Sequence, residues 1–118
     1  MIKLKHLIRE ENDRDHKAWR KDWLERHNAT FDERGRLIAY HGTPKRNLKS
    51  IKNNGFRQGS YFSLKQEYSK RIAVAYHETP ETPESDIIVL QVKLPMDAID
   101  FVASDIVATR PIQFSEVI

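Results

Sequence analysis

The chain has 118 residues, no cysteine and a net charge of +3. A chain of this length is typical of one domain that buries a core of its own. The lack of cysteine excludes disulfides, thiolate zinc sites and cysteine nucleophiles. No apolar run is long enough to cross a bilayer, and residues 1–10 are too charged for a signal peptide, so we expect a cytoplasmic protein without membrane contact.

The charges are unevenly distributed along the chain. Residues 1–55 hold 14 Lys and Arg against 8 Asp and Glu, whereas residues 56–118 hold 6 against 9. A basic first half could contact nucleic acid or an acidic protein surface. Acidic residues are interleaved with the basic ones there, which favours a solvated helical face instead.

Residues 1–30 are predicted to form a helical arm in two pieces. Trp19 and Trp23 lie four residues apart and form an apolar stripe on the second piece. We expect this stripe to pack on the rest of the domain, and a protein partner bound through the arm is the alternative. A polar loop at 30–35 separates the arm from the core at 36–118.

The first part of the core is predicted as strand, helix and strand. Residues 36–41 are apolar enough for a buried strand. Thr43 and Pro44 are typical of an N-cap and a first helical position, and Gly55 is expected to end that helix in a left-handed conformation. A short strand is predicted at 60–62.

A second helix is predicted after a capping box formed by Ser63 and Gln66. Its apolar side chains recur every four residues and are expected to share one face. They are Leu64, Tyr68, Ile72 and Tyr76. The acidic, Pro-interrupted segment 78–85 that follows is predicted to be a mobile surface loop.

The last third of the chain is predicted to be rich in strands. Residues 86–94 alternate clearly, and shorter strands are expected at 106–108 and 112–118, with 95–103 irregular. Helices and strands do not alternate strictly enough for a doubly wound sheet. The predicted fold class is therefore α+β.

Four short motifs with polar residues lie next to apolar segments of the chain. They are Tyr40-His41-Gly42-Thr43, Gly59-Ser60-Tyr61-Phe62-Ser63, Ala75-Tyr76 and Phe114-Ser115-Glu116-Val117-Ile118. Together they resemble the catalytic core of the ADP-ribosyltransferases, in the His-Tyr-Glu branch typified by diphtheria toxin and the poly(ADP-ribose) polymerases. The resemblance covers residues 37–118 and suggests a small member of bacterial or phage type. It implies a split β-sheet core with NAD⁺ in a cleft between two small sheets.

The resemblance assigns the NAD⁺-binding residues. His41 would bind a ribose hydroxyl, and Gly42 would offer its backbone amide and carbonyl to nicotinamide, with Thr43 and Ser63 nearby. These roles agree with the chemistry of an imidazole and of a residue without a side chain. The structural alternative is a histidine that satisfies a loop carbonyl and a glycine that turns the chain.

Two aromatic residues are expected to hold the nicotinamide ring between them. Tyr61 and Tyr76 match this pair, because stacking orients a flat ring without using its hydrogen bonds. Their separation in the chain is larger than is usual in the family, which leaves Tyr68 as an alternative second partner. For Tyr68 the sequence favours a place in the helix's core stripe.

Glu116 is expected to be the catalytic carboxylate, together with His41 and Tyr61. Cleavage of the glycosidic bond of NAD⁺ develops oxocarbenium character that a carboxylate stabilises. The alternative is a surface glutamate on a terminal strand. The arginine-modifying branch carries Gln or Glu where this chain has Phe114, so arginine is not indicated as acceptor.

The sequence therefore predicts an NAD⁺-dependent mono-ADP-ribosyltransferase that modifies a protein or nucleic-acid acceptor and uses no metal. The five histidines are scattered without the spacing of a zinc site. An RNA 2′-phosphotransferase is one alternative, because that family shares the fold and a His-Gly-Thr motif; such an enzyme would use the basic arm to bind RNA. A catalytically inactive protein-binding module is the other.

Overall fold

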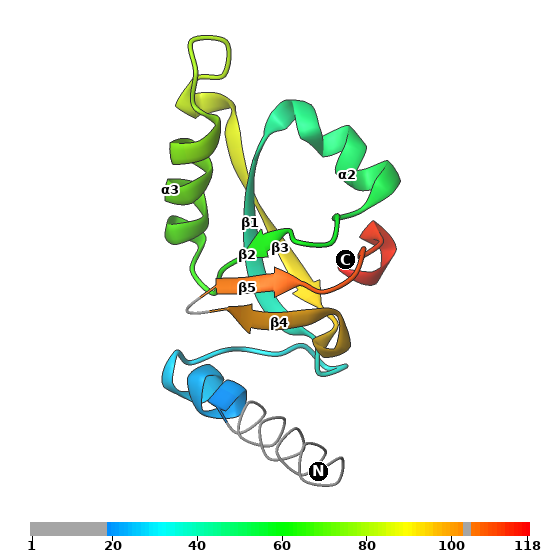
Figure 1. The fold of residues 1–118 in the computed structure, drawn as a ribbon. Helices are drawn as coiled ribbons and strands as arrows, with labels where there is room; N and C mark the ends of the chain where they lie inside the picture. Colours follow the sequence, from blue (N-terminus) through cyan, green and yellow to red (C-terminus); the bar gives the residue numbers. More distant parts are fainter. Residues whose placement is uncertain (1–18, 103–104) are drawn as a thin grey trace, which may run out of the picture.

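The computed structural model describes residues 19–102 and 105–118. They form a small α+β domain with two antiparallel sheets and three helices, which confirms the predicted fold class (Figure 1). The three helices are residues 19–26, α2 (Leu48–Asn54) and α3 (Gln66–His77). The first of the two predicted helical pieces of the arm lies outside the described residues.

The first sheet contains β1 (Leu37–Pro44) and β3 (Ile87–Leu94). The two strands pair over their whole length, from Leu37 opposite Leu94 to Pro44 opposite Ile87. Both segments are rich in aliphatic residues, and the strands predicted at 36–41 and 86–94 are confirmed. Leu37, Ala39, Val92 and Leu94 are buried in the hydrophobic core.

The second sheet has the strand order β2 (Tyr61–Phe62), β5 (Asp105–Ala108), β4 (Ile99–Val102). Its inner face is fully apolar and lies against the core of the first sheet. The buried side chains of that face are Phe62, Ile99, Phe101, Ile106 and Ala108. The prediction left residues 95–103 irregular and so missed β4, whose alternation covers only four residues.

Helix α3 packs on β1 through its smallest side chains. Ser69 and Ala73 are the buried residues of the helix, whereas Tyr68 is 41% exposed and Tyr76 81% exposed. The expected core stripe of large side chains is therefore wrong, including the assignment of Tyr68 to it. The cause lies at Gly42, where a Cβ atom would come within 2.6 Å of the Ala73 Cβ. Only small side chains let the helix approach the strand this closely.

Two predicted helix starts are also wrong. β1 continues through Thr43 to Pro44, and a 3₁₀ turn at Lys45–Asn47 leads into α2. Helix α3 begins after Lys65, so Ser63 makes no N-cap hydrogen bond to it. Helix α2 ends at Gly55 as expected, since Gly55 takes a positive φ of 74° and its N–H bonds to the Ile51 carbonyl. Its ψ of −159° differs from the left-handed helical cap that we predicted.

The C-terminal segment is not the strand that we predicted. Ile112 forms an isolated bridge with Phe56, and residues Phe114–Glu116 form a 3₁₀ turn. The Gln113 side chain and the Glu116 side chain cap this turn reciprocally. These capping hydrogen bonds stabilise the turn, so the segment does not take the extended conformation of a strand.

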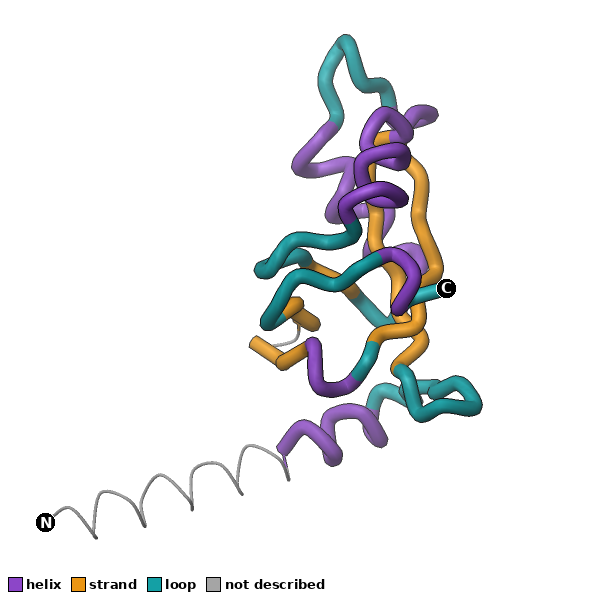
Figure 2. Tube along the Cα trace, turned by 90° about the vertical axis from the view of Figure 1, so that its right-hand side faces the viewer, coloured by secondary structure: helices purple, strands orange, loops and turns teal. Residues whose placement is uncertain are grey.

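The helix at residues 19–26 and the segment 78–85 lie at opposite ends of the molecule (Figures 1 and 2). Trp23 contacts Phe101 of β4 at a centroid distance of 5.0 Å, and Trp19 contacts the same ring edge-on. The tryptophan stripe thus packs on the domain, as expected. Segment 78–85 contains a bridge between Thr79 and Thr82, and Thr82 is buried and bonded to Arg46, which the prediction of a mobile loop missed.

Candidate functional site

His41 is held at the junction of the two sheets. Its Nδ1 lies 2.8 Å from the backbone oxygen of Tyr61 in β2. A carbonyl oxygen only accepts, so Nδ1 carries the proton and Nε2 of the neutral ring is an acceptor. The ring also lies edge-on to Phe56 at 5.0 Å and tilted against Phe62 at 5.4 Å. Its orientation is therefore fixed by one hydrogen bond and two aromatic contacts.

Nε2 of His41 has no hydrogen-bond partner among the described residues. In that part of the chain, every buried side-chain nitrogen or oxygen atom has a partner. Nε2 is therefore open to solvent and available to a ligand. This is the arrangement expected of a histidine that binds a hydroxyl group.

The strands β1 and β2 separate at Gly42. Tyr40 and Ser63 exchange two backbone hydrogen bonds, with N···O distances of 2.8 and 3.0 Å. In a continued ladder, Gly42 would be the next partner of Tyr61. The Tyr61 carbonyl instead accepts from the His41 ring, and the pairing stops.

Gly42 consequently has a free backbone edge. Backbone groups of alternate residues point to the same side of a strand, so Gly42 shares its edge with Tyr40 and points away from β3. No described strand pairs with it there. A free N–H and C=O on one residue can bind a primary amide through two hydrogen bonds.

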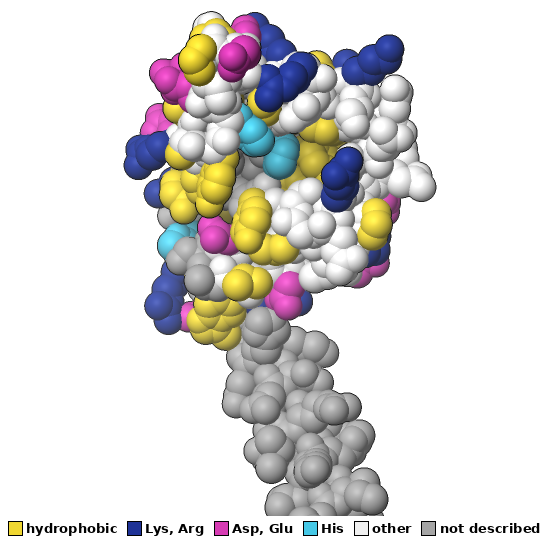
Figure 3. Space-filling view, turned by 45° about the horizontal axis from the view of Figure 1, so that its top comes forward, with side chains coloured by type: hydrophobic (Ala, Val, Ile, Leu, Met, Phe, Trp, Pro, Cys, Tyr) yellow, Lys and Arg dark blue, Asp and Glu magenta, His cyan; other side chains and the backbone are white. Residues whose placement is uncertain are grey.

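A second histidine lies close enough to His41 to influence it electrostatically. Burial is the main cause that lowers the pKa of His41 below its ordinary value of 6.5; the Tyr61 hydrogen bond opposes this, and the charge of His77 contributes to the lowering. Figure 3 shows histidine side chains side by side in a hollow, with hydrophobic side chains beside them. His41 is thus held neutral at neutral pH, and the sequence analysis missed His77 as its neighbour.

The outer face of the second sheet carries Tyr61 and a carboxylate. Tyr61 is opposite Val107 in β5, and its side chain is 60% exposed. Side chains two residues apart on a strand share a face, so Asp105 lies on the same face as Val107 and Tyr61. The sequence analysis missed Asp105, and its position at the first residue of the strand 105–108 was the available signal.

The remaining predicted ligand-binding residues are dispersed. The Thr43 side chain is buried and accepts a hydrogen bond from Asn47, at 3.3 Å. Ser63 Oγ donates to the Lys65 carbonyl and lies 2.5 Å from Ser69 Oγ, so it joins β2 to α3. Tyr76 projects into solvent from the last turn of α3, next to His77.

Glu116 lies in a different environment. Its carboxylate accepts two hydrogen bonds from the Arg110 guanidinium, at 3.0 and 3.2 Å, and one from the Gln113 N–H at 2.8 Å. The side-chain bonds to Arg110 are the main reason that the pKa of Glu116 is lowered. Among the described contacts, none joins this carboxylate to His41, Gly42 or Tyr61.

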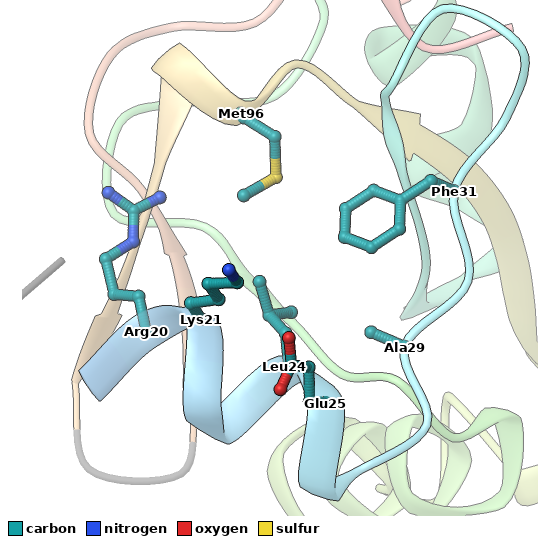
Figure 4. A pocket seen from close by; sticks show the side chains of 7 residues that line it. All are labelled: Arg20, Lys21, Leu24, Glu25, Ala29, Phe31 and Met96. Atoms are coloured by element: carbon teal, nitrogen blue, oxygen red, sulfur yellow. The ribbon is translucent and has the colours of Figure 1, made fainter. Parts of the chain in front are cut away.

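A groove of about 410 Å³ lies elsewhere, between the helix at 19–26, Phe31 and Met96 (Figure 4). None of the site residues lines it, so it is separate from the junction at His41. Within residues 19–102 and 105–118, no cluster of three or more His, Asp or Glu side chains is arranged to hold a metal ion. None of the helices in these ranges is long and apolar enough to span a membrane.

Comparison of the sequence with family models and with curated proteins assigned no family to the chain. No protein-family model matches the chain, and no curated protein is significantly similar to it.

Proposed function

We propose that the protein is an NAD⁺-dependent mono-ADP-ribosyltransferase whose site is the junction between β1 and β2. The observation that carries the proposal is the interruption of the strand ladder at Gly42 by the His41–Tyr61 hydrogen bond. It leaves a histidine nitrogen and a backbone amide edge open at the same place. These are the two groups that the resemblance assigns to the ribose and to the nicotinamide amide.

In this proposal, each group has a defined role. His41 Nε2 accepts a hydrogen bond from a ribose hydroxyl, and the N–H and C=O of Gly42 bind the carboxamide of nicotinamide. Tyr61 stacks on the nicotinamide ring, for which its exposed side chain is available. Nicotinamide leaves C1′ with the bonding electron pair, and an acceptor nucleophile forms the new bond to C1′.

The geometry favours Asp105 over Glu116 as the carboxylate that stabilises the developing positive charge. Asp105 shares the sheet face of Tyr61, one strand away. The Glu116 carboxylate is already paired with Arg110 and caps the C-terminal turn. Glu116, the residue expected from the sequence, would have to leave both partners in order to act on the ribose.

A comparison of Asp105→Asn with Glu116→Gln tests the proposal. NAD⁺ binding is measured by calorimetry, and turnover by the release of nicotinamide. We expect Asp105→Asn to lower turnover by about 10²–10³-fold with nearly unchanged affinity, because the carboxylate acts on the transition state. We expect Glu116→Gln to lower the melting temperature instead.

The opposite pattern would restore Glu116 as the catalytic carboxylate and contradict the assignment of Asp105. A wild-type protein that does not bind NAD⁺ at all would contradict the proposed function. That result would favour a protein-binding module with an inactive site.

A further inference from the structure

The segment between β1 and β2 carries a strongly basic surface. Its cations are Lys45, Arg46, Lys49, Lys52 and Arg57, and all five are exposed. The chain has no Asp or Glu between residues 37 and 66. None of these five cations forms an ion pair with another described residue. We call these five residues the basic face.

The basic face lies beside the junction at His41. Lys45 directly follows β1, and Phe56, which precedes Arg57, contacts the His41 ring. The Arg57 end of the segment thus lies next to the His41 ring, whereas the Lys45 end lies four residues beyond His41 along β1. In Figure 3, Lys and Arg side chains lie above and to the right of the hollow that holds the histidines.

The composition of this face indicates the chemistry of its partner. No large hydrophobic side chain is exposed between residues 45 and 60, whereas Asn53, Asn54 and Gln58 are exposed. Protein interfaces are usually centred on aromatic and apolar side chains. Interfaces with nucleic acids are more polar and much more positively charged. A polyanion with phosphate groups therefore fits this face better than an acidic protein.

We propose that the basic face binds single-stranded nucleic acid and presents it to the site as the acceptor of ADP-ribose. This inference rests on the proposed function, because it names the acceptor that the transferase would modify. A nitrogen or oxygen atom of the nucleic acid forms a bond to C1′ of the ribose. The C1′–N bond breaks, neutral nicotinamide leaves with the electron pair, and the acceptor atom releases its proton to solvent.

Binding is tested first without NAD⁺, by fluorescence anisotropy with labelled oligo(dT) and oligo(U) at several salt concentrations. We expect salt-dependent binding by the wild type, since each phosphate contact to a single strand contributes a slope of about −0.7 in log K against log salt. Lys49→Gln/Lys52→Gln should weaken binding and reduce the slope by about 1.4. The matched control is Lys21→Gln/Arg26→Gln, which removes the same charge from the helix at 19–26 and should leave both values unchanged.

Three outcomes would overturn the inference. The first is a wild type that binds neither oligonucleotide at low salt, and the second is an equal loss of binding in both double variants. Displacement of the oligonucleotide by poly-glutamate at equal charge would identify an acidic protein as the partner. Preference for oligo(dT) or oligo(U) distinguishes DNA from RNA.

Calorimetry with NAD⁺ separates this inference from the proposed function. Lys49→Gln/Lys52→Gln should keep the NAD⁺ affinity of the wild type while its oligonucleotide affinity falls. A variant with weaker NAD⁺ binding and unchanged oligonucleotide binding would contradict the inference. Oligonucleotide binding by a wild type that does not bind NAD⁺ would support the basic face and contradict the transferase.

Discussion

Replacement of Gly42 by alanine should push α3 away from β1 and destabilise the domain. An added Cβ would lie 2.4 Å from the backbone oxygen of Ser69 and 2.6 Å from the Cβ of Ala73. Ordinary contact begins at 3.4 Å, so the helix would have to move by about 1 Å. The φ angle of Gly42 is not positive, and the expected effect is therefore steric rather than conformational.

The size of the effect follows from the contacts that the shift disturbs. Overpacking of a core costs about 1–3 kcal/mol. The same shift would stretch the hydrogen bond from Ser69 Oγ to the Tyr40 carbonyl, at 2.9 Å, which adds about 0.5–1.5 kcal/mol. We expect a loss of about 1.5–4.5 kcal/mol in the free energy of unfolding. At about 4 °C per kcal/mol, the melting temperature should fall by about 6–18 °C.

Thermal unfolding followed by circular dichroism measures this loss. Gly35→Ala is the control, because Gly35 has a φ of 75° and nothing within 4 Å of its added Cβ. It should cost only the strain of a positive φ, about 1–2 kcal/mol. Ala73→Gly should cost less in the Gly42→Ala background than alone, since it removes one of the two clashes. A Gly42→Ala protein that melts within about 2 °C of the wild type would refute the close-approach argument.

Three further predictions concern the site residues. His41→Ala should weaken NAD⁺ binding by about 0.5–1.5 kcal/mol in calorimetry, as expected for one lost hydrogen bond, and an unchanged affinity would remove His41 from the site. Tyr61→Phe should keep NAD⁺ affinity and turnover, whereas Tyr61→Ala should lose both, because stacking needs the ring; equal damage by the two variants would contradict stacking. The pKa of folded His41 lies below 6.5, so the unfolded chain binds more protons in acid and stability falls as the pH drops below about 6.5. His41→Gln should lose less stability over that range in urea titrations, and a parallel loss in both proteins would contradict this account.

Most strands could be predicted from the sequence because their aliphatic residues are consecutive or alternate clearly. The strands at 37–44 and 87–94 are of this kind. The face of α3 could not be predicted in the same way. A periodicity argument assigns the buried face of a helix from its large apolar side chains. Helix α3 instead packs through the small side chains of Ser69 and Ala73, because these lie against Gly42 of β1.

The sequence indicates candidate site residues but not how they lie relative to one another. His41, Gly42 and Tyr61 are among these candidates, and in the structure the His41 ring contacts the Tyr61 carbonyl beside Gly42. Their contact depends on where the β1–β2 pairing stops, which spacing along the chain does not reveal. The prediction of Glu116 depended on a terminal strand, whereas the chain forms a 3₁₀ turn there and the carboxylate pairs with Arg110.

Gly42 connects the fold with the proposed chemistry. The absence of its side chain lets α3 approach β1, and the interruption beside it leaves its backbone edge open. A substitution at Gly42 therefore changes packing and site together and cannot report on either one separately. His41 and Tyr61 are better probes of the site. The Tyr61 side chain is exposed, and Nε2 of His41 has no hydrogen-bond partner among the described residues. Loss of NAD⁺ binding at these two positions without loss of the helix packing would place the chemistry at the junction rather than in the core.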